Sequence, residues 1–212
     1  MRDFVNCLIT SMKGIKDMKK LIYVNSIIRK DESRTKRLID GILKAFKGKV
    51  EIKEINLNDL DLNPFNETTY QDKVDNGVPQ VFYDLSKEIA ESDGLIIASP
   101  FWDMSIPAML KSFLEKISLF DVMFVSDDRK CIGIAKCPFM FYVTTRGMNI
   151  KDGDDLEQGT SYLKALCWLW GIKKFEVVSC SNFDYISEEE IKRITNEKIN
   201  EGIKKLDSLI NY

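Results

Sequence analysis

The sequence predicts an α/β protein built on a doubly wound parallel sheet, and three observations lead to this fold class. Apolar, β-rich runs alternate with helical patterns along the 212 residues. Most of the runs are apolar at consecutive positions, which is typical of strands that are buried on both faces of a parallel sheet. A segment long enough for a crossover helix follows each of the first four runs, as parallel neighbours require.

Five strands are expected from these runs. Their predicted ranges are 21–25, 50–55, 94–99, 139–145 and 175–179. Five strands separated by helices suit an open sheet of order 2-1-3-4-5, with helices on both faces.

Five helices are expected between and after the strands, at 33–46, 80–91, 107–117, 156–170 and 187–209. The first has an apolar stripe through Leu38, Ile42 and Phe46. Such spacing is typical of a helix packed on a sheet. The third begins with a proline at a first-turn position, and the last with a serine cap followed by three glutamates. Two segments show no pattern: a long connection at 56–79 and an irregular excursion at 118–138.

Composition limits the kind of protein. Net charge is −2, so no nucleic-acid surface is indicated, and no apolar run approaches the roughly 20 residues of a membrane span. Met18 precedes KKLIYVN, so residues 18–212 are interpreted as one domain, and 1–17 as a disordered or misassigned extension. Five cysteines without a CxxC spacing argue against disulfides or zinc and favour reduced thiols in the cytoplasm, with Cys167 and Cys180 packed inside.

The chain contains no histidine. This excludes every histidine-based catalytic triad and removes the commonest general base and metal ligand. Chemistry carried by a bound cofactor is therefore favoured.

In a doubly wound sheet, ligands bind beyond the carboxyl ends of the strands, where the strand order reverses. This brings three loops together. The first contains Ser26, Ser33, Arg34 and Thr35 at the start of a helix, where hydroxyls and free N–H groups suit a phosphate. It lacks the GxGxxG and Walker patterns. The alternative is a capped helix with Arg29 in solvent.

The second loop, Pro100-Phe101-Trp102-Asp103-Met104, offers flat apolar surface to a planar ring, and Asp103 an acceptor for a ring N–H. The alternative is that the aromatic side chains close the core edge or a subunit contact.

The third loop, Thr145-Arg146-Gly147-Met148, combines a glycine that lets backbone approach a ligand with a positive charge. Its alternative is a turn with an exposed arginine. A phosphate site, a ring site and a polar edge together match flavin mononucleotide (FMN).

At these loops the sequence resembles the FMN-dependent NADH azoreductases, within the flavodoxin-like NAD(P)H:quinone reductases, from about residue 20 onwards. The most specific piece is SPFWDMSIPAMLKSFLEKISLFDVMF. It is similar to the family's aromatic rim, its Ser-Ile-Pro helix start and its Gly-Val-x-Phe segment. Thr145-Arg146-Gly147-Met148 resembles the family's Ser-Arg-Gly-Gly.

The resemblance implies a flavodoxin-like three-layer fold and a homodimer with FMN at the subunit interface. It also implies two-electron transfer from NADH or NADPH to quinones or azo compounds by a ping-pong mechanism. FMN is favoured over FAD. By resemblance, Ser26, Ser33 and Thr35 hold the phosphate with support from Arg34. Pro100 to Met104 line the flavin ring. Thr145 to Met148 face its pyrimidine edge, where Arg146 favours the reduced anion.

This sequence departs from the family at two rim positions. Asp103 replaces a common asparagine, and Met148 replaces a glycine and is expected to narrow the pocket. Trp168 and Trp170 are expected in the core, with the option that one reaches the partner's site. Two other functions stay open: a flavodoxin-type electron carrier without its own NAD(P)H oxidation, and a binding module without turnover.

Overall fold

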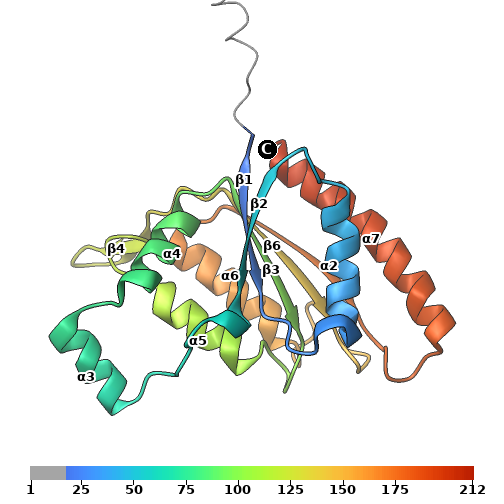
Figure 1. Cartoon of the computed structure of the whole chain (residues 1–212), viewed down its shortest axis with the longest axis horizontal. Helices are drawn as coiled ribbons and strands as arrows, with labels where there is room; N and C mark the ends of the chain where they lie inside the picture. The colour runs from blue at the N-terminus through green and yellow to red at the C-terminus, as the bar shows by residue number, and fades with distance from the viewer. Residues whose placement is uncertain (1–17) are drawn as a thin grey trace, which may run out of the picture.

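A computed structural model describes residues 18–212, so the expectation for residues 1–17 lies outside the described part. The centre is a five-stranded parallel sheet, flanked by helices on both faces (Figure 1). Its order is β2-β1-β3-β6-β7. The strands span Lys20–Asn25 (β1), Glu51–Asn56 (β2), Gly94–Pro100 (β3), Phe139–Thr145 (β6) and Lys174–Cys180 (β7).

The predicted strands are confirmed, and each end lies within one residue of its expected position. Counted among themselves, the five sheet strands follow the predicted order 2-1-3-4-5. The labels differ because β4 and β5 form a separate two-stranded sheet. Strands β3 and β6 are the most buried: every residue of β6 and all but the last residue of β3 are buried.

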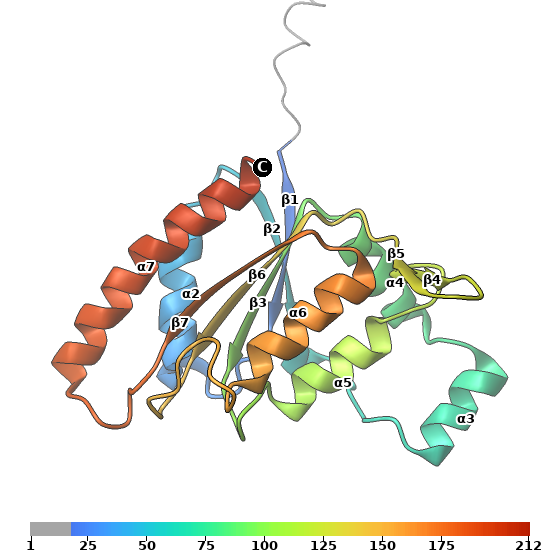
Figure 2. The ribbon, with the colours of Figure 1, turned by 180° about the vertical axis from the view of Figure 1, so that it is seen from behind.

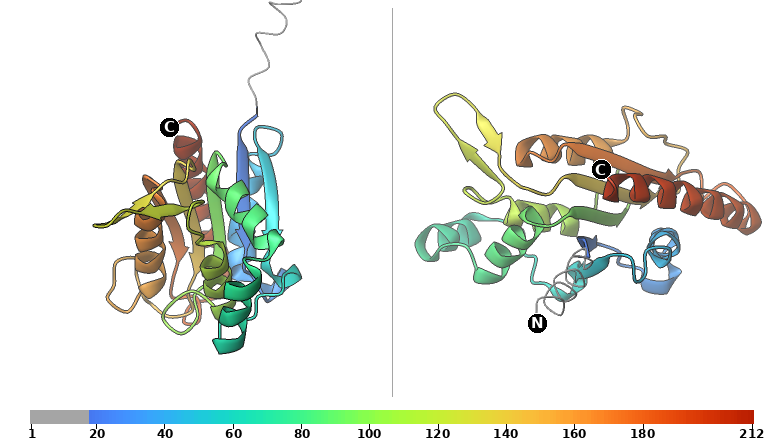
Figure 3. Two further views of the ribbon diagram at one scale, coloured as in Figure 1. Left: turned by 90° about the vertical axis from the view of Figure 1, so that its left-hand side faces the viewer. Right: turned by 90° about the horizontal axis from the view of Figure 1, so that it is seen from above.

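The helices form two layers (Figures 1 and 2). One layer contains α2 and α7, whose apolar side chains share a core with one face of the sheet. The other contains α4, α5 and α6, which cover the opposite face. Figure 3 shows the sheet between these layers. The helix bounds are Arg34–Lys44 (α2), Gln80–Ala90 (α4), Ala108–Ile117 (α5), Gln158–Trp170 (α6) and Glu188–Ile210 (α7).

Two segments without a sequence pattern contain regular structure, which corrects the expectation of irregular chain. The 56–79 connection holds a short 3-10 helix, Leu57–Asp59, and helix α3, Glu67–Asn76. Helix α3 buries none of its residues, so it has no apolar stripe to reveal it, and a capping box at Asn66 supports its start. The excursion at 118–138 contains the antiparallel strands β4, Phe124–Ser126, and β5, Cys131–Gly133.

Buried side chains confirm part of the packing expected from the sequence. Cys167 and Cys180 are buried, and burial raises the pKa of each thiol to about 12, so neither is a reactive thiolate at neutral pH. Trp170 is fully buried, as expected, but Trp168 is 72% exposed, so its placement in the core was wrong. Within residues 18–212, every helix is too short or too polar to span a lipid bilayer.

Candidate functional site

A cavity of about 390 Å³ lies beyond the carboxyl ends of β1, β3 and β6. Its size falls within the range of about 300–1,000 Å³ that is usual for small-molecule sites. All three predicted loops contribute to it. The predicted residues that line it are Ser33, Arg34, Thr35, Pro100, Phe101, Trp102, Thr145, Arg146 and Gly147.

The first loop forms an anion site at the start of α2. A turn of 3-10 helix, Lys30–Glu32, leads into Ser33, whose hydroxyl accepts a hydrogen bond from the Lys36 N–H at 3.2 Å. The other N–H groups of the first helical turn have no acceptor within the helix. Arg29 and Arg37 line the same cavity, although Arg37 was not predicted. Free N–H groups, the helix dipole and guanidinium groups together favour a phosphate.

A buried hydroxyl pair joins the first loop to the third. Thr35 Oγ1 and Thr145 Oγ1 are 2.7 Å apart, and both residues are buried. This contact connects the first turn of α2 to the end of β6. The predicted phosphate site and the predicted ring edge are therefore held together directly.

Arg34 is held by carboxylates that the sequence did not indicate. It donates a hydrogen bond to Asp184 at 2.8 Å and lies 3.9 Å from Glu188. Asp184 also occupies the space beside Gly147: a Cβ there would lie 1.8 Å from the Asp184 Oδ2. Glycine is thus required at position 147 because the Asp184 side chain fills the space that a Cβ would need. Because Asp184 is 150 positions from Arg34, no local pattern could have revealed this pair.

The second loop is a tight turn with an aromatic pair at its start. Phe101 is buried, whereas Trp102 is 42% exposed and lines the cavity. Trp102 and Ser105 exchange two backbone hydrogen bonds, at 3.0 and 2.9 Å, around Asp103 and Met104. Both central residues have positive φ, 47° and 66°, which stores backbone strain of about 1–3 kcal/mol per residue. The Gln158 N–H anchors the turn by donating to the Met104 carbonyl at 2.9 Å.

Arg146 lies almost fully buried at the third loop, with 1% of its surface exposed. Its guanidinium donates to the Ile150 carbonyl at 3.0 Å and to Asp152 at 2.5 Å, and it lies 3.6 Å from a Glu157 oxygen. It also stacks on the Phe101 ring, 5.3 Å from the centroid. The alternative of an exposed arginine is therefore wrong.

Unpaired polar atoms gather behind this loop. Within the described residues, buried side-chain atoms without a hydrogen-bond partner are Tyr142 Oη, Thr144 Oγ1, Arg146 Nε, Glu157 Oε2 and Thr160 Oγ1. All five lie on the end of β6, the loop after it or the start of α6. Burial raises the pKa of Tyr142 to about 12, so its hydroxyl is neutral at physiological pH. The buried polar atoms without partners are thus concentrated where β6 ends and α6 begins.

Four predicted residues do not line the cavity: Ser26, Asp103, Met104 and Met148. The Ser26 hydroxyl is buried and donates to the Ala98 carbonyl at 3.1 Å. Met148 is partly exposed, and the expected narrowing by its side chain is not seen in the cavity lining. Asp103 and Met104 contribute the turn described above.

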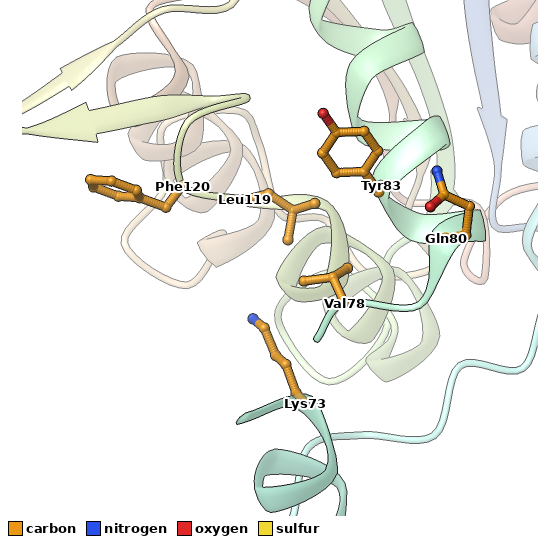
Figure 4. Close-up of a pocket in the computed structure, with 6 residues that line it drawn as sticks. All are labelled: Lys73, Val78, Gln80, Tyr83, Leu119 and Phe120. Carbon is orange, nitrogen blue, oxygen red and sulfur yellow. The ribbon is translucent and has the colours of Figure 1, made fainter. Parts of the chain in front are cut away.

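A second cavity, of about 460 Å³, lies between α3, α4 and the segment after α5 (Figure 4). Its lining is Lys73, Val78, Gln80, Tyr83, Leu119 and Phe120. It contains none of the predicted site residues and a single charged group, so its chemistry defines no ligand class.

The fold and the site define a class of protein: a doubly wound domain with an anion site and an aromatic rim at its switch point. Residues 19–203 match the family described as having a flavodoxin-like fold, and the chain belongs to this family. The resemblance expected from the sequence is confirmed.

Individual relatives extend this result. The chain is 28% identical over 204 residues to FMN-dependent NADH:quinone oxidoreductase 2 of Clostridium perfringens, covering 91% of this chain and 98% of the relative. It is 25% identical over 198 residues to a protein of the same name from Clostridium acetobutylicum, covering 88% and 99%. An FMN-dependent NADH-azoreductase from Bacillus anthracis, solved in complex with FMN, has the same fold, with a TM-score of 0.78. That pair is 19% identical over 89% of this chain and 99% of the other.

Proposed function

We propose that this protein is an FMN-dependent oxidoreductase that transfers two electrons from NADH or NADPH to quinones or azo compounds. The observation that carries the proposal is the meeting of an anion site and an aromatic rim in one cavity of about 390 Å³. The names of the relatives, FMN-dependent NADH:quinone oxidoreductase and FMN-dependent NADH-azoreductase, support the same activity.

The donor set of the cavity fits FMN. The first turn of α2, with Ser33, Thr35 and Arg34, would hold the terminal phosphate. Trp102, partly exposed at the rim, would pack beside the flavin ring. Thr145, Arg146 and Gly147, which line the same cavity, would face the polar edge of the ring. Pro100, which also lines the cavity, would support the contacts with the ring, whereas Ser26, predicted to hold the phosphate, lies outside the cavity lining.

FMN, when bound, supplies the redox chemistry that couples nicotinamide oxidation to quinone or azo reduction in two half-reactions. The chain's residues would bind and orient the cofactor, and Phe101 and Trp102 would shield one part of it from water. We further propose a cytoplasmic homodimer with the site at the subunit interface.

The proposal is tested with the purified protein under anaerobic conditions. We expect a yellow protein with a flavin spectrum that NADH bleaches within seconds and that a soluble quinone restores. Stopped-flow traces with NADH and with NADPH identify the donor. A yellow protein that only an added reductase can bleach would instead indicate an electron carrier. A protein that takes up no FMN would contradict the proposal.

Replacing Ser33 and Thr35 together with alanine is expected to weaken FMN binding by more than about a hundredfold. The change removes two hydroxyls from the predicted phosphate site, and hydrogen bonds to charged groups contribute about 1.5–3 kcal/mol each. Fluorescence titration of the apoprotein with FMN measures the effect.

Two control variants separate phosphate binding from helix capping. Thr35→Ser keeps the hydroxyl and should retain most of the affinity. Ser187 caps α7 with the same geometry, accepting from the Glu190 N–H at 3.2 Å, so Ser187→Ala reports the cost of a lost cap alone. Equal FMN affinity in S33A/T35A and the wild type would place the phosphate elsewhere.

A further inference from the structure

Glu157 caps helix α6 with one carboxylate oxygen and leaves the other for Arg146. Its Oε1 accepts hydrogen bonds from the N–H groups of Gly159 and Thr160, both at 3.0 Å. Its Oε2 has no hydrogen-bond partner and lies 3.6 Å from the Arg146 guanidinium. Both side chains are fully buried. Two buried opposite charges at this separation interact far more strongly than they would in water.

A buried carboxylate is an unusual cap in this chain. Among the described helices, α2, α3 and α7 are capped by the neutral side chains of Ser33, Asn66 and Ser187. A neutral cap would have satisfied the α6 N–H groups without the cost of burying a charge. The negative charge of Glu157 therefore points to a role towards Arg146.

The net charge of Arg146 and its neighbouring carboxylates is not positive. Asp152 accepts from the guanidinium at 2.5 Å and is itself held by the Ser179 hydroxyl at 2.8 Å. With Glu157 on the other side, one positive charge faces two negative charges. The cluster of Arg146, Asp152 and Glu157 thus carries a net charge of about −1, although the sequence alone suggests a positive edge.

We infer that Glu157 is a positioning residue that holds the Arg146 guanidinium against Phe101 and offsets its charge at the cavity wall. If FMN binds here, as the proposed function requires, Glu157 keeps the reduction potential of the bound FMN below the value that Arg146 alone would set. Positive charge beside a flavin favours its reduced, more negative form. An arginine whose charge is offset by neighbouring carboxylates therefore favours that form less. Neither Glu157 nor Asp152 belongs to the three loop motifs.

The test is the two-electron midpoint potential of bound FMN in Glu157→Gln. Glutamine keeps an oxygen that can accept from Gly159 and Thr160, so the cap is preserved while the charge is removed. We expect the preference for reduced over oxidised FMN to increase about tenfold, which corresponds to about 30 mV for a two-electron couple. Asp155→Asn is the matched control, because Asp155 lies two positions away, is exposed and loses the same charge. Its potential should equal that of the wild type.

A double substitution tests the charge balance. R146M/E157Q removes one charge of each sign and should return the potential to the wild-type value, while Arg146→Met alone should lower it. If E157Q does not fold, Asp152→Asn replaces it and should raise the potential in the same direction. A yellow E157Q protein with an unchanged potential would overturn the inference. A wild-type protein that takes up no FMN would instead overturn the proposed function.

Discussion

Replacing Arg146 with methionine is expected to lower the free energy of unfolding by about 3–5 kcal/mol, the usual cost of removing one partner from a buried ion pair. Methionine fills similar volume but leaves the fully buried Glu157 carboxylate without its cation. It also leaves the Ile150 carbonyl without its donor. Urea denaturation of the apoprotein, followed by circular dichroism, measures the loss without any cofactor.

The R146M/E157Q protein is the critical comparison, because removing both charges should recover much of the lost stability. Arg193→Met is a surface control. Arg193 pairs with Glu190 and Glu197 on the exposed side of α7, and such pairs contribute little because water screens them. If R146M were as stable as R193M, the buried cluster around Arg146 would have no part in holding the third loop.

Reversing the charge of Arg34 is expected to weaken FMN binding by about a hundredfold or more. Arg34→Glu replaces an attractive group at the proposed phosphate site with a repulsive one, and a hundredfold loss corresponds to about 2.7 kcal/mol. The Asp184 and Glu188 carboxylates that now contact Arg34 would add to the repulsion. FMN titration at low and high salt checks the result, since a charge effect should shrink as salt rises.

Arg129→Glu provides the control for this change in net charge. Arg129 is exposed between β4 and β5 and does not line the proposed site. Its FMN affinity should match that of the wild type. An Arg34→Glu protein with wild-type affinity and an unchanged melting temperature would remove Arg34 from the phosphate site.

The sequence was most informative where burial imposes a pattern. Strands β3 and β6 are apolar along most of their length because both faces are covered, so their positions could be read directly. Helix α3 was missed because it buries no residue and therefore has no apolar periodicity. Strands β4 and β5 were missed because three-residue strands are too short to show alternation.

For the site, the predicted topology correctly brought the three loops together at one cavity. It did not reveal the carboxylates that hold these loops in place. Asp184, Asp152 and Glu157 are carboxylates in polar segments, where a solvated residue has the same sequence appearance as a buried one. The burial of Arg146 follows from these partners and was therefore unpredictable from the motif Thr145-Arg146-Gly147. The roles of the loop residues in flavin binding stay predictions that the titrations above address.

Helix α3 projects from the edge of the molecule (Figure 1), and we expect it to unfold locally before the sheet does. It contributes no buried side chain, and its amide groups are protected by its own ten residues and one cap. An isolated helix of this length is marginal in water. Deuterium should therefore enter the backbone of Glu67–Asn76 long before it enters β3 or β6, and a protease should cut α3 before it cuts the strands of the sheet.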